Sequence, residues 1–140
     1  MAYRGKYTPT NKTKYKGDWS KITFRSLWER SVMRWANANP NVVAWNSEEV
    51  VIPYVCPTDR KRHRYFMDFY FEFKSGERYI IEVKPDAQTR PPKAGKRKTK
   101  RFITETMTYA KNDAKWKAAT AFAEQNGLHF EIWTEKVLQQ

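Results

Sequence analysis

Apolar and polar residues follow two different periodicities along this chain, and these periodicities divide it into helices and strands. Between residues 22 and 37, apolar side chains recur at helical spacing, which predicts an amphipathic helix that ends at Asn39-Pro40. A second helix is predicted from Phe102 to Asn126, with Gly127 as its stop. Its buried stripe is expected to consist of Phe102, Tyr109, Trp116, Ala119, Phe122 and Ala123.

Runs of β-branched and aromatic residues predict the strands. These runs cover residues 42–45, 49–54, 65–73, 78–84 and 128–133. The first two are expected to pair across the polar turn 46–48, and the next two to form a hairpin closed by Lys74-Ser75-Gly76-Glu77. The order is helix, four strands, helix, strand, which predicts an α/β or α+β domain with a mixed sheet of about five strands flanked by helices.

Two basic segments lack any regular periodicity. Residues 1–20 are expected to form an extended N-terminal arm, part of which packs on the domain or on DNA. Residues 85–101 contain three prolines and predict a basic loop. A chain of 140 residues fits one core, so residues 21–140 are expected to be a single domain.

The net charge indicates the kind of partner. The chain has 27 Lys and Arg against 15 Asp and Glu, a formal net charge of +12. We therefore expect a polyanion, and nucleic acid rather than a membrane, because no helix combines a basic face with a strongly apolar one. No apolar run approaches the roughly 20 residues of a membrane span, and the first residues lack a signal-peptide pattern. The protein is therefore expected in the cytosol where it is made.

The cysteine and histidine counts restrict the metal chemistry. One cysteine, Cys56, excludes an internal disulfide, and with only His63 and His129 beside it the count argues against a Cys/His zinc site. Any catalytic metal is then expected to be held by carboxylates. Cys56 itself is interpreted as a small buried residue, because no partner base is evident.

Three charged residues in the predicted hairpin suggest a catalytic site. Asp68 lies in an aromatic strand, and Glu82 and Lys84 point to one face of the neighbouring strand. If the hairpin closes near residues 75–76, Asp68 and Glu82 face each other. A divalent cation stabilises such a pair of carboxylates, and Mg²⁺ prefers oxygen ligands of this kind. Lys84 could then orient or deprotonate an attacking water.

A simpler interpretation of the same residues is a surface salt bridge, since Glu-x-Lys on an exposed strand is common. Two features favour the catalytic interpretation. Both acids fall in apolar strands that are predicted to be adjacent, and the basic loop begins directly after Lys84.

The combination of these residues with the element order resembles the PD-(D/E)XK nuclease superfamily over most of the chain. Asp68 matches the motif's aspartate, and Glu82-Val83-Lys84 matches its Glu-x-Lys. Met67 stands where the motif usually has proline, which leaves the liganding group itself unaffected. The resemblance implies a restriction-endonuclease-like core in which Asp68, Glu82 and the Val83 carbonyl hold Mg²⁺, with Mn²⁺ as a substitute.

Further motifs are similar to the tailed-phage head completion nuclease family. They are Tyr-Arg-Gly-Lys-Tyr near the start, Tyr15-Lys16-Gly17-Asp18, Arg25-Ser26-Leu27-Trp28-Glu29, Ser47-Glu48-Glu49, Ile52-Pro53-Tyr54, His63-Arg64-Tyr65-Phe66, Asp68-Phe69-Tyr70 and Lys96-Arg97-Lys98-Thr99-Lys100-Arg101. The resemblance implies a nuclease of double-stranded DNA, endo- or exonucleolytic, that acts in the host cytoplasm before heads and tails join. It implies portal or neck proteins as further partners and association with the virion as a further location. The chain is also similar to transposon end-cleaving nucleases of the same superfamily.

Other acids are candidates for the same site. In the related nucleases an acid from the first helix reaches the metal, which implies this role for Glu29. The alternative is a helix-surface glutamate paired with Arg25 or Arg30. Glu48 and Glu49 point to opposite sides, so at most one can face the site, and both rank below Glu29.

Basic residues in several segments are expected to bind the DNA backbone without reading bases. They are Lys6, Arg62, His63, Arg64, Arg90, Lys93, Lys96, Arg97, Lys98, Lys100, Arg101, Lys111 and Lys115. His63 is interpreted as a phosphate contact rather than a general base, since Lys84 already fills that role. For Lys111 and Lys115 a solvated helix face is an equal alternative.

Two other functions fit the basic surface. One is a structural head-neck protein that binds the DNA end without required catalysis, and the other is a small nucleic-acid-binding module. A structural protein gains nothing from three carboxylates within a basic surface. A binding module needs surface aromatic residues that stack on bases, whereas most aromatic residues here are expected to be buried.

Overall fold

The computed structural model describes residues 4–93, 95 and 99–138. The helices are α1 (Leu27–Ala38), α2 (Lys100–Asn126) and α3 (Glu135–Leu138), with 3₁₀ turns at Lys12–Lys14, Trp19–Lys21 and Asp86–Thr89. The strands are β1 (Gly5–Lys6), β2 (Thr23–Phe24), β3 (Val42–Asn46), β4 (Val51–Val55), β5 (Arg62–Phe66), β6 (Phe69–Phe73), β7 (Arg78–Val83) and β8 (His129–Trp133). No helix in these ranges is long and apolar enough to cross a membrane.

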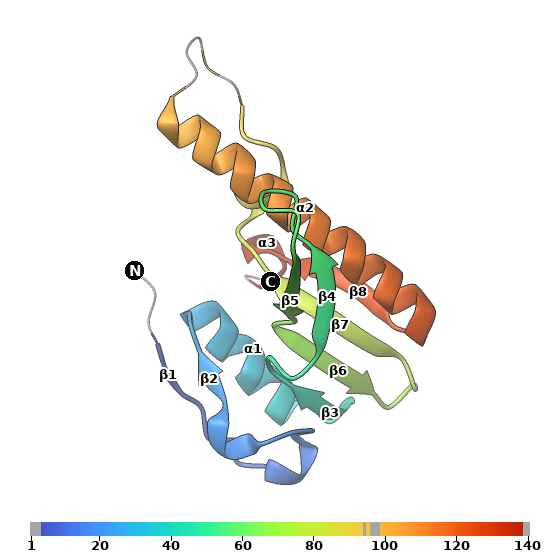
Figure 1. The fold of residues 1–140 in the computed structure, drawn as a ribbon. Helices are drawn as coiled ribbons and strands as arrows, with labels where there is room; N and C mark the ends of the chain where they lie inside the picture. Colours follow the sequence, from blue (N-terminus) through green and yellow to red (C-terminus); the bar gives the residue numbers. More distant parts are fainter. Residues whose placement is uncertain (1–3, 94, 96–98, 139–140) are drawn as a thin grey trace.

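A mixed sheet forms the centre of the described structure, as the sequence predicts. Its strand order is β3-β6-β7-β8, with β7 and β8 parallel and the other neighbours antiparallel. Figure 1 shows α1 on one side of this sheet, and α2 together with the β4–β5 hairpin on the other. The predicted α/β class, a mixed sheet flanked by helices, is therefore confirmed, with four strands in the central sheet of the described residues.

One predicted strand pairing is wrong. Strands β3 and β4 were expected to pair with each other, but β3 pairs with β6, and β4 pairs with β5 in a separate two-stranded sheet. Glu48 adopts a left-handed backbone with φ of 58°, which turns the chain away between the two strands. Pro53 in β4 lacks an N–H, so it fits the edge of a hairpin better than the interior of a sheet.

Alternation along the two central strands produces two cores. Phe69 and Phe71 of β6, with Ile81 of β7, belong to the core on the α1 side. Their sequence neighbours Tyr70, between Phe69 and Phe71, and Ile80, directly before Ile81, belong to the core beneath α2 and the β4–β5 hairpin. Because successive strand residues point to opposite faces, the sheet buries apolar side chains on both.

The helix ends follow local capping chemistry. The Ser26 hydroxyl accepts a hydrogen bond from the Glu29 N–H (3.2 Å), so α1 begins at Leu27 and not at residue 22 as predicted. Thr99 caps α2 in the same way, so α2 begins at Lys100, two residues before the predicted start at Phe102. Gly127 ends α2 with a left-handed φ of 67°, as predicted from the sequence. Of the predicted stripe on α2, Trp116, Ala119 and Ala123 are buried, and Asn112 joins them.

The described part of the N-terminal segment packs on the domain. Strand β1 pairs with β2, and Tyr15 is buried against Trp45 with their rings 4.9 Å apart. The Lys14 ammonium donates to the carbonyl of Ala36 at 2.7 Å, at the end of α1. The described part of the predicted arm contains two 3₁₀ turns, and Tyr15 and Tyr7 join the core on the α1 side, whereas Trp19 is exposed. Burying a tyrosine stabilises the fold because it releases water from a large apolar surface.

Candidate active site

The register of the β6–β7 hairpin brings Asp68 opposite Glu82. Phe69 pairs with Ile81, and Asp68 and Glu82 are the next residues along the two chains. Asp68 Oδ2 accepts a hydrogen bond from the Val83 N–H at 2.8 Å, which fixes the carboxylate at the end of β7. The hairpin turn at Ser75-Gly76 sets this register, with Gly76 at a positive φ of 92°.

Two aromatic side chains hold Glu82 from the other side. The Tyr65 hydroxyl of β5 donates to Glu82 Oε2 at 2.5 Å, and the indole N–H of Trp116 in α2 donates to the same oxygen. All three side chains are buried. Burial and the neighbouring Glu82 raise the pKa of Tyr65, so its hydroxyl keeps its proton and acts as a donor.

The position of Asp68 beside Glu82 disfavours its charged form. Burial, and then repulsion from Glu82, raise the pKa of Asp68 to about 7, and the Val83 N–H offsets part of the rise. Lys84 lies beside the pair, with its ammonium 3.7 Å from Glu82 Oε1. Two carboxylates that repel each other in a desolvated place are an arrangement typical of functional sites.

The carboxylates open into a cavity of about 500 Å³. The side chains that line it combine acids with cations and come from several segments of the chain. They are Arg25, Glu48, Arg64, Tyr65, Phe66, Asp68, Glu82, Lys84 and Lys115. The ammonium of Lys115 lies over the rings of Tyr65 (5.4 Å) and Tyr54 (5.9 Å), so a predicted DNA-binding lysine of α2 faces the cavity.

The structure places the other candidate acids differently. Glu29 raises the pKa of Asp68 through its charge, and its own pKa is raised by burial and by Glu48, which places it near the pair. Its Oε2 lies 3.3 Å from the Ser26 hydroxyl, so it also belongs to the cap of α1. Glu48 lines the cavity and pairs with Arg25 at 3.1 Å, whereas Glu49 is exposed and packs against Gly17.

The predicted DNA-binding residues divide into three groups. Arg64 and Lys115 line the cavity. Lys6, Arg62, Arg90, Lys93, Lys100, Arg101 and Lys111 are exposed, and within this group Arg90 pairs with Asp86 and Arg101 with Glu105. Lys96, Arg97 and Lys98 lie outside the described residues. His63 is half-buried and its Nε2 lies 2.7 Å from Asp59 Oδ2, so it is paired within the β4–β5 hairpin.

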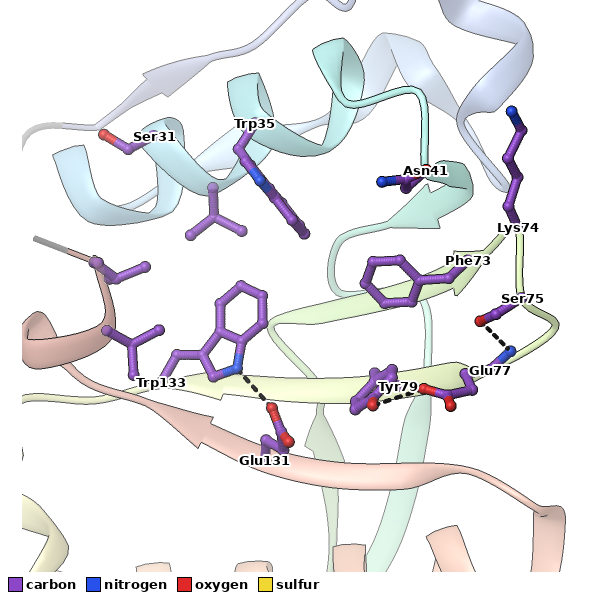
Figure 2. A pocket seen from close by; sticks show the side chains of 13 residues that line it. Ser31, Trp35, Asn41, Phe73, Lys74, Ser75, Glu77, Tyr79, Glu131 and Trp133 are labelled. Atoms are coloured by element: carbon purple, nitrogen blue, oxygen red, sulfur yellow. Dashed lines mark hydrogen bonds between the residues drawn. The ribbon is translucent and has the colours of Figure 1, made fainter. Parts of the chain in front are cut away.

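A larger hollow of about 720 Å³ lies on the opposite side of the sheet. Figure 2 shows its walls, with Trp35 of α1 facing Trp133 of β8, and Phe73 and Tyr79 further along the sheet. The acids that line it are exposed, and Asp68 and Glu82 are not among its residues. The smaller cavity, which Asp68, Glu82 and Lys84 line, is therefore the candidate active site.

Sequence reasoning missed Tyr65, Trp116 and Arg25. Tyr65 and Trp116 lie 17 and 34 residues from Glu82, and both read as core aromatic residues. Their polar groups could have indicated a role, because a buried tyrosine or tryptophan needs a hydrogen-bond acceptor for its O–H or N–H. Arg25 precedes the cap of α1, and the sequence indicated it only as part of the motif Arg25-Ser26-Leu27-Trp28-Glu29 and as a partner of Glu29.

Comparison with known proteins agrees with this geometry. The family model described as "TnsA-like endonuclease N terminal" matches residues 39–135, which include the whole hairpin and its carboxylates. The chain belongs to this family of endonuclease domains.

A particular relative extends the similarity to the N-terminal segment. The chain is 46% identical over 143 aligned residues to the "Head completion nuclease" of Enterobacteria phage T4, and the alignment covers 99% of this chain and 95% of that protein. The resemblance drawn from the sequence motifs is confirmed.

Proposed function

We propose that this chain is a nuclease that hydrolyses phosphodiester bonds in double-stranded DNA, with little sequence specificity, during phage head completion in the host cytoplasm. The observation that carries the proposal is the pair Asp68 and Glu82, which face each other beside Lys84 in a cavity lined by cations. The family match and the similarity to a head completion nuclease support it. Contact with portal or neck proteins and association with the virion stay predictions.

The donor set fits a hard divalent cation. Asp68 and Glu82 supply carboxylate oxygens, and their mutual repulsion and burial, which raise the pKa of Asp68, are what a bound cation would relieve. Asp68, Glu82 and the Val83 carbonyl would hold Mg²⁺, with Mn²⁺ as a substitute, and Glu29 would add an oxygen to the first or second shell. The bound ion would polarise the phosphoryl oxygen and lower the pKa of the attacking water.

The protein side chains have separate roles around this centre. Tyr65 and Trp116 fix Glu82 Oε2 and leave Oε1 directed to Lys84. Lys84 orients the attacking water and offsets negative charge that develops on the phosphate oxygens. Arg64 and Lys115 bind neighbouring phosphates at the cavity, a contact that carries no base information and so accounts for low sequence specificity.

The proposal is tested by cleavage of linear and supercoiled duplex DNA with Mg²⁺, with Mn²⁺ and with EDTA. The parent, Asp68→Asn and Glu82→Gln are compared at equal DNA occupancy. We expect metal-dependent cleavage by the parent and a loss of about 100-fold or more in each variant, because a lost ligand removes several kcal/mol of transition-state stabilisation.

Glu72→Gln is the matched control. Glu72 also accepts a hydrogen bond from a buried tyrosine, Tyr70 (2.6 Å), but it lies outside the cavity and is expected to leave cleavage unchanged. Undiminished cleavage by Asp68→Asn and Glu82→Gln would contradict this site. Absence of cleavage by every form, with DNA binding retained, would instead favour a structural head-neck protein.

A further inference from the structure

The closed end of the β4–β5 hairpin gathers three different metal-binding groups. Cys56 follows β4, Asp59 lies in the turn and His63 lies in β5. One donor atom from each, the Cys56 sulfur, an Asp59 carboxylate oxygen and a His63 ring nitrogen, lies within 4.8 Å of the other two. None of the three lines the cavity that contains Asp68 and Glu82.

We propose that Cys56, Asp59 and His63 form a second metal site, which binds Zn²⁺ and closes the end of the hairpin. Zinc in proteins is bound by thiolate, imidazole and carboxylate donors at about 2.0–2.3 Å, so donors around one ion lie about 3.5 Å apart. To reach this spacing each separation needs to change by only about 1 Å: the His63–Asp59 pair, now 2.7 Å apart, would widen, and the separations of up to 4.8 Å would shorten. Water would complete the fourth position.

The hairpin already orients these donors. The turn is closed by backbone hydrogen bonds from Cys56 N to Lys61 O (2.9 Å) and from Arg60 N to Cys56 O (2.8 Å), with Arg60 at a left-handed φ of 60°. The Lys61 N–H holds Asp59 Oδ1 at 2.9 Å, which directs Oδ2 to His63. Groups that fix a ligand in this way raise metal affinity, because less freedom is lost on binding.

The Cys56 sulfur is positioned from a second direction. It is buried, and it lies 3.1 Å from the Thr58 hydroxyl, which can donate a hydrogen bond to a thiolate. Asp59 is exposed and His63 only half-buried, so their side chains are free to move by the small distance that coordination requires.

The local charge is compatible with a dication despite the basic sequence around it. A thiolate and a carboxylate together neutralise Zn²⁺. Arg62 and Arg64 are exposed neighbours of His63 in β5 and project from the opposite face of that strand, because adjacent strand residues alternate. One cysteine and two histidines are too few for a site made of those residues alone, but the fold brings the Asp59 carboxylate beside Cys56 and His63.

The donor types distinguish this site from the catalytic centre. Asp68 and Glu82 offer only oxygen, which suits Mg²⁺ or Mn²⁺, whereas the sulfur and nitrogen donors of the hairpin favour Zn²⁺. The two sites can therefore be tested independently, and failure of the zinc site would leave the proposed nuclease chemistry intact.

The test uses Co²⁺ as a spectroscopic substitute for zinc in the full chain after EDTA treatment and buffer exchange. A thiolate bound to Co²⁺ gives a charge-transfer band in the near ultraviolet, which an all-oxygen site cannot give. We expect one equivalent of Co²⁺ to produce this band and one equivalent of Zn²⁺ to remove it. Cys56→Ser is expected to lose the band, and Asp68→Asn is expected to retain it.

Three further variants keep the test informative if Cys56→Ser folds poorly. His63→Gln and Asp59→Asn change side chains that are not buried and are expected to weaken Co²⁺ binding strongly, while Thr58→Val weakens it about 10- to 100-fold. His129→Gln is the matched histidine control, in strand β8. The absence of a band in the parent would overturn the proposal. A band of equal affinity in His63→Gln and Asp59→Asn would also overturn it, because it would indicate a thiol adduct alone.

Discussion

Replacement of Tyr65 by phenylalanine tests whether the aromatic donors position Glu82 for catalysis. The hydroxyl donates at 2.5 Å to a buried carboxylate, and water cannot readily replace it because Tyr65 and Glu82 are both buried. A hydrogen bond to a charged group contributes about 1.5–3 kcal/mol, so Tyr65→Phe is expected to lower the free energy of unfolding by this amount.

The functional effect of Tyr65→Phe is a separate quantity. Groups that orient a metal ligand typically change metal affinity or activity about 10- to 100-fold. We therefore expect the Mg²⁺ concentration at half-maximal cleavage to rise by about this factor. The measurement is the rate of nicking of supercoiled DNA over a range of Mg²⁺ concentrations, with parent and variant at equal fractions folded.

Tyr70→Phe provides a close control within the same chain. Tyr70 is also buried and donates to a glutamate at 2.6 Å, but that residue, Glu72, is partly exposed and is also bound by Lys16 at 2.8 Å. Its loss is expected to cost about 1 kcal/mol or less and to leave the Mg²⁺ dependence unchanged. Equal Mg²⁺ dependence in Tyr65→Phe and Tyr70→Phe would refute the positioning role of Tyr65.

Three other properties follow from the structure. The folded chain holds the Asp68 proton with a pKa of about 7 against an ordinary 3.8, so in EDTA the free energy of unfolding falls as pH rises from about 4 to 7. Relative to Asp68→Asn this fall amounts to about 4 kcal/mol at most. If the free energies of unfolding of the parent and of Asp68→Asn, measured by urea denaturation, changed equally across this pH range, the prediction would be wrong. Ser26→Ala removes the cap of α1 and is expected to lower the free energy of unfolding by about 1 kcal/mol in the same assay. An unchanged urea concentration at the midpoint of unfolding would show that the cap does not stabilise the fold. Lys115→Gln is expected to weaken DNA binding and to reduce the salt dependence of that binding by about one counterion. Lys111→Gln, one turn away and exposed, is expected to change DNA binding less. Equal effects of the two substitutions would argue against a phosphate contact by Lys115 at the cavity.

The parts of the fold that depend on neighbouring residues could be predicted from the sequence. Gly127 after a long amphipathic run ends α2, and Ser75-Gly76 closes the hairpin that brings Asp68 opposite Glu82. These features follow from backbone geometry within a few residues. Because the hairpin register is local, the two carboxylates of the candidate site were predictable as well.

The contacts that depend on distant segments were not predictable. A strand run gives no indication of which other run it pairs with, so residues 42–45 and 49–54 were paired by proximity in sequence, although Pro53 argued against a central position. Trp116 was predicted to be buried, but its indole N–H could have met any acceptor beneath α2. The partner, Glu82, follows only from the packing of the helix on the sheet.

The charges at the cavity explain why a strongly basic protein places repelling acids beside one another. Four cationic side chains and three acidic ones line it, so an approaching phosphate meets attraction at the rim and repulsion from Asp68 and Glu82. Without a divalent ion, the raised pKa of Asp68 relieves this repulsion by retaining a proton near neutral pH. A bound dication would replace that proton and reverse the sign of the field at the carboxylates. On this reasoning, metal binding releases a proton below about pH 7, and tight phosphate binding in the cavity depends on the metal, whereas general attraction to DNA does not.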